Sequence, residues 1–156
     1  MRYNINGITD CICTWIEKNS VVPELLSFTL AFGVSSERNY ETPSLLVGIA
    51  SKSEIEDWKK EDDFIEYIWN QAEYTYYEIE EGCINDNYYF EEEMPREYFI
   101  LMLSKDKNEI ISHIYKKIGF KIPIYIHDLD NHDIHSIISD NFDESEIQRF
   151  KEKGLL

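Results

Sequence analysis

The chain has few of the residues on which several common functions depend. Its 156 residues include only six glycines, four prolines and three cysteines. The glycines do not cluster, which excludes nucleotide binding through a glycine-rich phosphate loop. Cys11, Cys13 and Cys83 do not resemble a disulfide framework, and Cys11 and Cys13 are expected to be small buried hydrophobes. These observations predict a reduced protein whose location is cytoplasmic.

Long apolar runs are also missing. The longest, Tyr98 to Leu103, has six residues and is far shorter than a membrane span. The polar N-terminus has no apolar core like that of a signal peptide. At 43% hydrophobic and 14% aromatic residues, the chain has enough apolar material to form a core. Its length fits one domain, so we expect a single globular domain over 1–156.

Positive charge is scarce. Fifteen Lys and Arg face 31 Asp and Glu, which gives a formal net charge of −16. Such acidity argues against nucleic acid and anionic membranes as partners, because both repel it. The acids are concentrated in residues 61–95, a stretch that contains no Lys or Arg, twelve acids and nine aromatics. A charge so concentrated can steer a basic protein towards one face, and nearby aromatics can anchor it.

Hydrophobic periodicity predicts alternating helices and strands. We expect helices over 8–18, from Asp62 or Asp63 onward, over 110–118, over 131–139 with Asn131 as a cap, and from Asp143 to Gly154, with strands over 25–34, 45–50 and 122–126. The first two strands most simply pair antiparallel, and residues 98–103 fit either a strand or a helical turn. The predicted fold class is α/β (α+β): a small mixed β-sheet with an N-terminal hairpin and helices packed on it.

Two segments give more detailed predictions. Along 25–34, large apolar residues alternate with small ones such as Ser27 and Thr29, which indicates a close neighbour on the second face of the strand. From Asp62, one apolar stripe at helical spacing runs through Ile65, Ile68, Trp69, Ala72, Tyr76 and Ile79 towards a stop at Gly82. Only 62–73 is firmly helical in this interpretation, because 74–80 is rich in tyrosine and also fits a strand.

The acids of 61–95 have two interpretations. They form either a solvated outer face or a surface for a partner, since ordinary exposed helices mix charges of both signs to gain stabilising pairs. In the second interpretation the contact residues lie off the apolar stripe or in the loop after it. The predicted contact residues are Glu73, Tyr77, Glu80, Glu81, Tyr88 and Glu91.

A second motif could carry metal chemistry. Residues 127–135 contain three of the four histidines, interleaved with three aspartates. Imidazole and carboxylate bind zinc and other divalent ions. The candidate ligands are His127, Asp128, His132 and His135. Turn and cap chemistry explains the same residues without a metal, and no metal or other cofactor is expected.

Several segments together resemble a bacterial family known as domain of unknown function 4303. They are the strand Phe28-Thr29-Leu30-Ala31-Phe32, the segment from Trp69 to Tyr74, and the C-terminal block from Ile122 through Asp128-Leu129-Asp130 to the helix at Asp143. The resemblance carries no catalytic residues. It implies an immunity or antitoxin role, because small acidic members of that family look like neighbours of toxins.

The favoured hypothesis is therefore an acidic inhibitor of a basic partner, such as a nuclease toxin. The alternatives are a metal-dependent enzyme that uses 127–135, and a regulatory or structural module whose acidity serves solubility. No catalytic motif stands out, so an enzyme is the less favoured class.

Overall fold

A central strand organises the computed structural model, which describes residues 5–34, 41–77, 79, 96–130 and 133–156. β1 (Pro23–Val34) pairs antiparallel with β2 (Glu41–Ser51) and parallel with β3 (Ile124–Asp128). The strand order is β2-β1-β3. The predicted hairpin is confirmed, but β2 begins earlier than expected and includes Pro43. Proline is tolerated there because β2 is an edge strand of this sheet.

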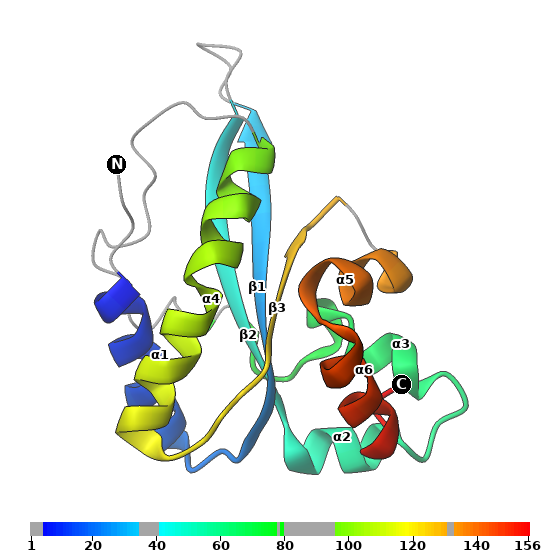
Figure 1. Ribbon diagram of the computed structural model, residues 1–156. Helices are drawn as coiled ribbons and strands as arrows, with labels where there is room; N and C mark the ends of the chain where they lie inside the picture. The colour runs from blue at the N-terminus through cyan, green and yellow to red at the C-terminus, as the bar shows by residue number, and fades with distance from the viewer. Residues whose placement is uncertain (1–4, 35–40, 78, 80–95, 131–132) are drawn as a thin grey trace.

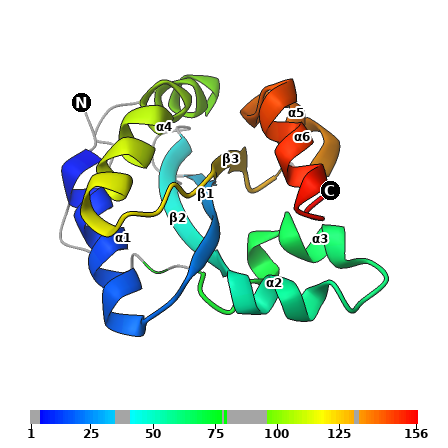
Figure 2. The same ribbon diagram turned by 60° about the horizontal axis from the view of Figure 1, so that its bottom comes forward.

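Helices cover both faces of the sheet (Figure 1). α1 (Ile5–Asn19) and α4 (Arg96–Ile118) lie on one face. The other face carries α2 (Lys52–Trp58), α3 (Phe64–Ile68), the short 3₁₀ helix η1 (Gln71–Glu73), α5 (Ile134–Asn141) and α6 (Glu144–Glu152). The view from below separates the two groups clearly (Figure 2). The α+β class with a small mixed sheet is therefore confirmed.

The alternation along β1 divides the interior into two cores. Leu26, Phe28 and Leu30 pack with buried residues of α1 and α4. Leu25 points to the opposite face, where it joins an aromatic core beneath α5 and α6. A strand that sends successive side chains to opposite faces can serve two cores at once.

The predicted helix over 62–73 is wrong beyond Ile68. α3 has only five residues, η1 follows, and the chain is extended at Tyr74. Asn70 interrupts the helix because its side chain accepts a hydrogen bond from the Ala72 backbone N–H at 3.1 Å, a contact that favours turns over helix interiors. Ala72 is exposed, whereas Ile68 and Trp69 are buried as predicted. Gly82 lies outside the described residues.

The ambiguous segment 98–103 is helical. It belongs to the 23-residue α4, and the predicted stripe continues along the same helix with Ile110 and Ile114 fully buried. Despite this length, none of the described helices is both long and apolar enough to cross a membrane.

The C-terminal helices begin with caps. The helix expected over 131–139 begins instead at Ile134, where the Asp133 side chain accepts from the Ser136 backbone N–H; Asn131 lies outside the described residues. α6 has the predicted capping box of Asp143 and Glu146. Gly154, at φ +69°, follows the end of α6.

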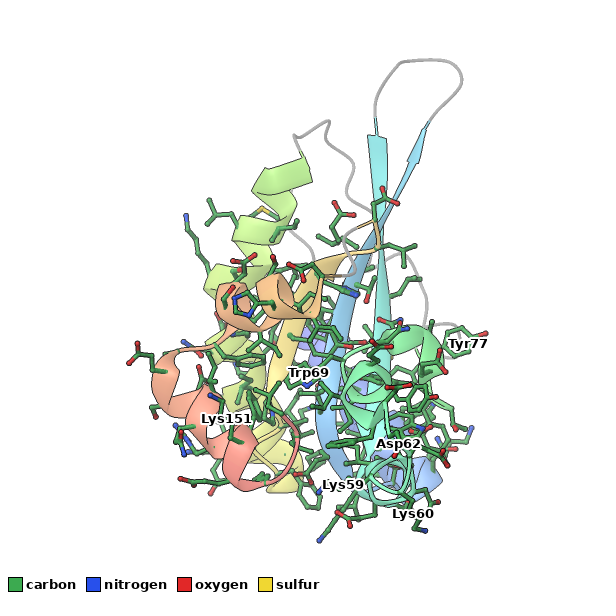
Figure 3. The ribbon with its side chains drawn as sticks, turned by 90° about the vertical axis from the view of Figure 1, so that its right-hand side faces the viewer. Lys59, Lys60, Asp62, Trp69, Tyr77 and Lys151 are labelled. Atoms are coloured by element: carbon green, nitrogen blue, oxygen red, sulfur yellow. The ribbon has the colours of Figure 1, made fainter. Side chains whose placement is uncertain are left out.

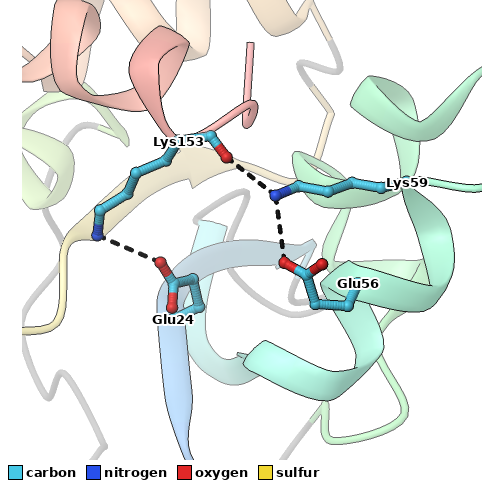
Figure 4. A network of polar contacts seen from close by, with 4 residues as sticks. All are labelled: Glu24, Glu56, Lys59 and Lys153. Carbon is cyan, nitrogen blue, oxygen red and sulfur yellow. Dashed lines mark hydrogen bonds and ion pairs between the residues drawn. The ribbon is translucent and has the colours of Figure 1, made fainter.

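The end of α6 is tied to two other elements (Figure 4). The Lys153 ammonium lies 3.2 Å from the Glu24 carboxylate at the start of β1. The Lys59 ammonium, just after α2, donates to the Lys153 carbonyl at 2.9 Å and to Glu56 at 3.3 Å. Ion pairs of this exposed kind contribute little energy, but they fix where the helix ends.

Asn141 closes the outer edge of β3. Its side-chain oxygen accepts from the Ile126 backbone N–H at 2.7 Å, and its side-chain nitrogen donates to the Ile126 carbonyl at 2.8 Å. The same nitrogen donates to the Ile137 carbonyl at 2.8 Å. The amide therefore satisfies two strand groups that would otherwise lack a neighbouring strand.

Replacing Asn141 by Ala should lower the free energy of unfolding by about 1–3 kcal/mol, because the part-buried backbone groups of Ile126 lose their partners. Urea denaturation measures the change. Asp140→Ala, at the exposed neighbouring position on α5, is the control and should change stability by less than about 0.5 kcal/mol. Equal effects of the two substitutions would contradict the proposed edge closure.

Candidate binding surface

Five exposed carboxylates form what we call the acidic surface: Glu61, Asp62, Asp63, Glu66 and Glu73. They run from the loop before α3 to η1. None of their side chains makes a hydrogen bond or ion pair with another residue in the part of the chain that the structure describes. Asp63 stands at the N-cap of α3 without bonding it. Their negative charge is therefore available to a partner.

The acids just before this surface are different, because each has a partner. Glu56 pairs with Lys59 at 3.3 Å, Asp57 pairs with Lys60 at 2.7 Å, and Glu54 accepts from the Thr75 backbone N–H at 2.7 Å. The change from paired to unpaired carboxylates falls at Glu61. It coincides with the point after Lys60 where Lys and Arg disappear from the sequence.

Buried neighbours hold this segment in place. Trp69 is 1% exposed, and its indole N–H donates to the Leu155 carbonyl at 2.8 Å. Its ring meets those of Tyr125 and Phe150 edge-on, with centroids 5.5 and 5.3 Å away. The Tyr74 hydroxyl, also buried, donates to the Ile68 carbonyl at 2.5 Å. Trp69 and Tyr74 point inward, and Glu73 between them faces solvent.

Tyr77 is an exposed aromatic at the end of this segment. Its predecessor, Tyr76, accepts from the Ile49 backbone N–H at 2.7 Å and packs edge-on against Trp15 at 5.0 Å. Extended chain sends successive side chains to opposite sides, so Tyr77 points outward and is 53% exposed. Figure 3 shows Tyr77 on the same side as Asp62, with Lys151 across the molecule.

The structure describes two of the predicted contact residues. Glu73 and Tyr77 are exposed, and their contact with a partner stays a prediction. Glu80, Glu81, Tyr88 and Glu91 lie outside the described residues. The predicted contacts did not include Glu61, Asp62, Asp63 and Glu66, although the absence of Lys and Arg after Lys60 was a usable signal.

The predicted metal ligands are not gathered in what the structure describes. His127 is 6% exposed, and its Nδ1 lies 3.1 Å from the Thr29 hydroxyl. Asp128 accepts from the Asp130 backbone N–H at 2.9 Å, while His135 is exposed on α5. His132 is outside the described residues. Within the described ranges, no three His, Cys, Asp or Glu residues form a group able to hold a metal.

A buried polar cluster lies on the second face of the sheet, as the small residues of β1 predicted. Ser27 donates to the Gln71 side-chain oxygen at 2.6 Å, and the Thr29 hydroxyl donates to the same oxygen. All three residues are at most 5% exposed. Hydrogen bonds of this kind satisfy buried polar groups. The cluster therefore joins η1 to β1, and its burial excludes direct contact with a large partner.

Two tyrosines extend the polar contacts into the aromatic core. The Tyr74 and Tyr125 hydroxyls lie 2.9 Å apart. Burial raises the pKa of both phenols well above their ordinary value of 10.0, because the charged phenolate is poorly solvated there.

The two cysteines of α1 differ from each other. Cys13 is buried and free, as expected. Cys11 is disulfide-bonded, so the expectation that both are reduced is wrong.

Alkaline pH should destabilise the protein through Tyr74 and Tyr125. Their folded pKa values exceed the unfolded value near 10, so the neutral forms stabilise the fold below pH 10. That stability is lost as the pH rises above 10, by about 1.4 kcal/mol per pH unit for each phenol. Urea denaturation at pH 8, 10 and 11 should show a shallower loss for Tyr125→Phe than for wild type. If the free energy of unfolding fell equally steeply with pH in the two proteins, the link between Tyr125 ionisation and stability would be contradicted.

No protein-family model, no curated protein and no solved structure matches this chain. The acidic surface with Tyr77 is therefore interpreted from its own residues alone.

Proposed function

We propose that this chain is an acidic binding protein of the immunity or antitoxin type, which neutralises a basic toxin. The observation that carries the proposal is the acidic surface: five exposed carboxylates without an intramolecular partner among the described residues, followed by the exposed ring of Tyr77. A nuclease is the favoured kind of toxin, because carboxylates can occupy positions that nucleic-acid phosphates take in its basic cleft.

The distribution of charge supports recognition over mere solubility. Like charges close together cost stability, and these five fall within 13 residues, 61–73. Solubility alone does not require such concentration, since acids spread over the molecule serve it equally well. A concentrated field instead steers a basic partner and speeds association, an effect that salt weakens.

Tyr77 supplies the second half of the proposed interface. Charge at the rim of an interface mainly sets the association rate, whereas a buried aromatic anchor slows dissociation. The Tyr77 ring stands out from the surface, and Tyr76 beside it is fixed to β2 and to Trp15. A rigid base under an exposed ring lowers the entropy lost on binding.

The immunity role in this proposal is the one that the sequence resemblance to the family of domain of unknown function 4303 implies; no family model matches the chain. An immunity protein acts where its toxin would damage the producing cell. The binding partner would then be a basic protein made by the same host.

Neutralising the acidic surface should weaken binding. A variant with Glu61→Gln, Asp62→Asn, Glu66→Gln and Glu73→Gln removes four negative charges that lack partners. The basic protein that copurifies with wild type from host extract should associate with this variant about 10–100 times more slowly at low salt. Surface plasmon resonance at several salt concentrations measures the rate and its salt dependence.

The matched control removes the same amount of charge from exposed acids elsewhere: Glu109→Gln, Asp140→Asn, Glu144→Gln and Glu152→Gln. Its association rate should stay within a few-fold of wild type. The proposal fails if both variants lose binding equally, if binding is indifferent to salt, or if wild type captures no basic protein.

Removing the Tyr77 ring should act on dissociation. If Tyr77 is an anchor, Tyr77→Ala should cost about 2 kcal/mol or more of binding free energy, mostly through a faster dissociation rate. The fold should be unaffected, because the side chain is 53% exposed. Dissociation from the captured partner gives the measurement, and an unchanged rate would remove Tyr77 from the interface.

A further inference from the structure

A pocket of about 270 Å³ lies near the edge of the sheet that β3 forms. Residues of α4, of the connection between α4 and β3, and of α6 line it. The lining residues are Asn108, Ile111, Lys121, Ile122, Pro123, Glu146, Arg149, Phe150 and Lys153. None of them belongs to the acidic surface.

Part of the lining is apolar and fixed in the core. Ile122 and Phe150 are 1% and 4% exposed, so each shows only a small part of its side chain to the pocket. Ile111 and Pro123 are half-buried beside them. The size of the pocket is at the lower end for small-molecule sites, which limits an occupant to a compact body.

Cations outnumber acids in the pocket, whereas acids outnumber cations in the whole chain. Three cations, Lys121, Arg149 and Lys153, face one acid, Glu146, although the whole chain has 31 acids and 15 Lys and Arg. The Glu146 carboxylate is already occupied, because it accepts from the Asp143 backbone N–H at 2.9 Å. The pocket is therefore locally positive in a strongly negative protein.

Two of these cations have no carboxylate partner among the described residues. The Arg149 guanidinium donates to the Ser145 hydroxyl at 3.1 Å and weakly to the Ser145 carbonyl at 3.4 Å. The Lys121 ammonium lies 5.3 Å from the centre of the Tyr115 ring. Lys153 differs, since it pairs with Glu24 at 3.2 Å. Arg149 and Lys121 thus keep charge available for a ligand.

We propose that this pocket binds a small amphipathic anion: a carboxylate or phosphate monoester attached to a compact apolar body. The planar guanidinium of Arg149 suits either headgroup, because its donors match their oxygen geometry. The apolar body would lie on Ile122 and Phe150. This site goes beyond the proposed toxin binding and does not depend on it, since the two surfaces share no residue.

The test uses phenylacetate as the probe and phenylacetamide as its uncharged counterpart. In a two-dimensional NMR titration, phenylacetate should shift the backbone amides of Ile111, Ile122 and Phe150 with a dissociation constant on the order of 1 mM. Phenyl phosphate, titrated separately, distinguishes a preference for phosphate from one for carboxylate. Saturable binding of either anion at these residues supports the proposal.

Matched variants locate the anion. Arg149→Gln should weaken binding about tenfold, which corresponds to loss of one charge-assisted hydrogen bond. Lys151→Gln removes the same charge from the same helix at a residue outside the pocket lining, and should change binding by less than about twofold. If the NMR spectrum of Arg149→Gln shows that this variant does not fold like wild type, Lys121→Gln takes its place.

The proposal is overturned by any of three results. They are the absence of saturable shifts for both anions up to about 20 mM, equal binding of phenylacetamide and phenylacetate, and equal effects of the Arg149 or Lys121 variant and the Lys151 control. Toxin binding is measured separately, so each proposal can fail alone.

Discussion

The burial of Trp69 is the constraint on which much of the structure depends. Its indole N–H reaches the Leu155 carbonyl, and its ring meets those of Tyr125, Phe142 and Phe150. One side chain thereby joins β3, α6, the α5–α6 connection and the chain end to the segment after α3. Because the chain turns Ile68, Trp69 and Tyr74 inward, Glu73, which lies between Trp69 and Tyr74, is left on the outside. The core therefore contributes to the exposed position of this acid.

The two faces of the sheet are held by different forces. On the α1 and α4 face the buried core is apolar and is held by burial, while an ion pair between Lys117 and Asp10 joins the two helices at the surface. On the other face Ser27 and Thr29 require the Gln71 oxygen, and Gly48 permits the close approach. A Cβ at Gly48 would come within 2.7 Å of the Ser27 hydroxyl and 2.9 Å of the Gln71 side chain. The residues on this face can pack in few other ways, so η1 is held in one position against the sheet.

Sequence reasoning succeeded where a pattern is local. The alternation along β1, the stripe of α1 and the capping box of α6 each follow from neighbouring residues. It failed at 69–73, where helical spacing continued but the turn at Asn70 ended the helix. At 74–80 the tyrosines allowed a strand, but the pairing of Tyr76 with Ile49 is a tertiary contact that their β-propensity alone did not specify. The concentration of acids was visible in the sequence, but the structure was needed to show that Glu61, Asp62, Asp63 and Glu66 are exposed.

Asn141 has a consequence for the size of the sheet. A side-chain amide has an N–H donor and a C=O acceptor, as a peptide group does. Asn141 therefore bonds to the edge of β3 as a strand of a single residue would. It is the last residue of α5, whose preceding turn is packed into the core through Ile137 and Ile138. Another strand could add at this position only by displacing the helix. One side chain thus limits the width of the sheet on this side, because it occupies strand groups that would otherwise be open to another strand.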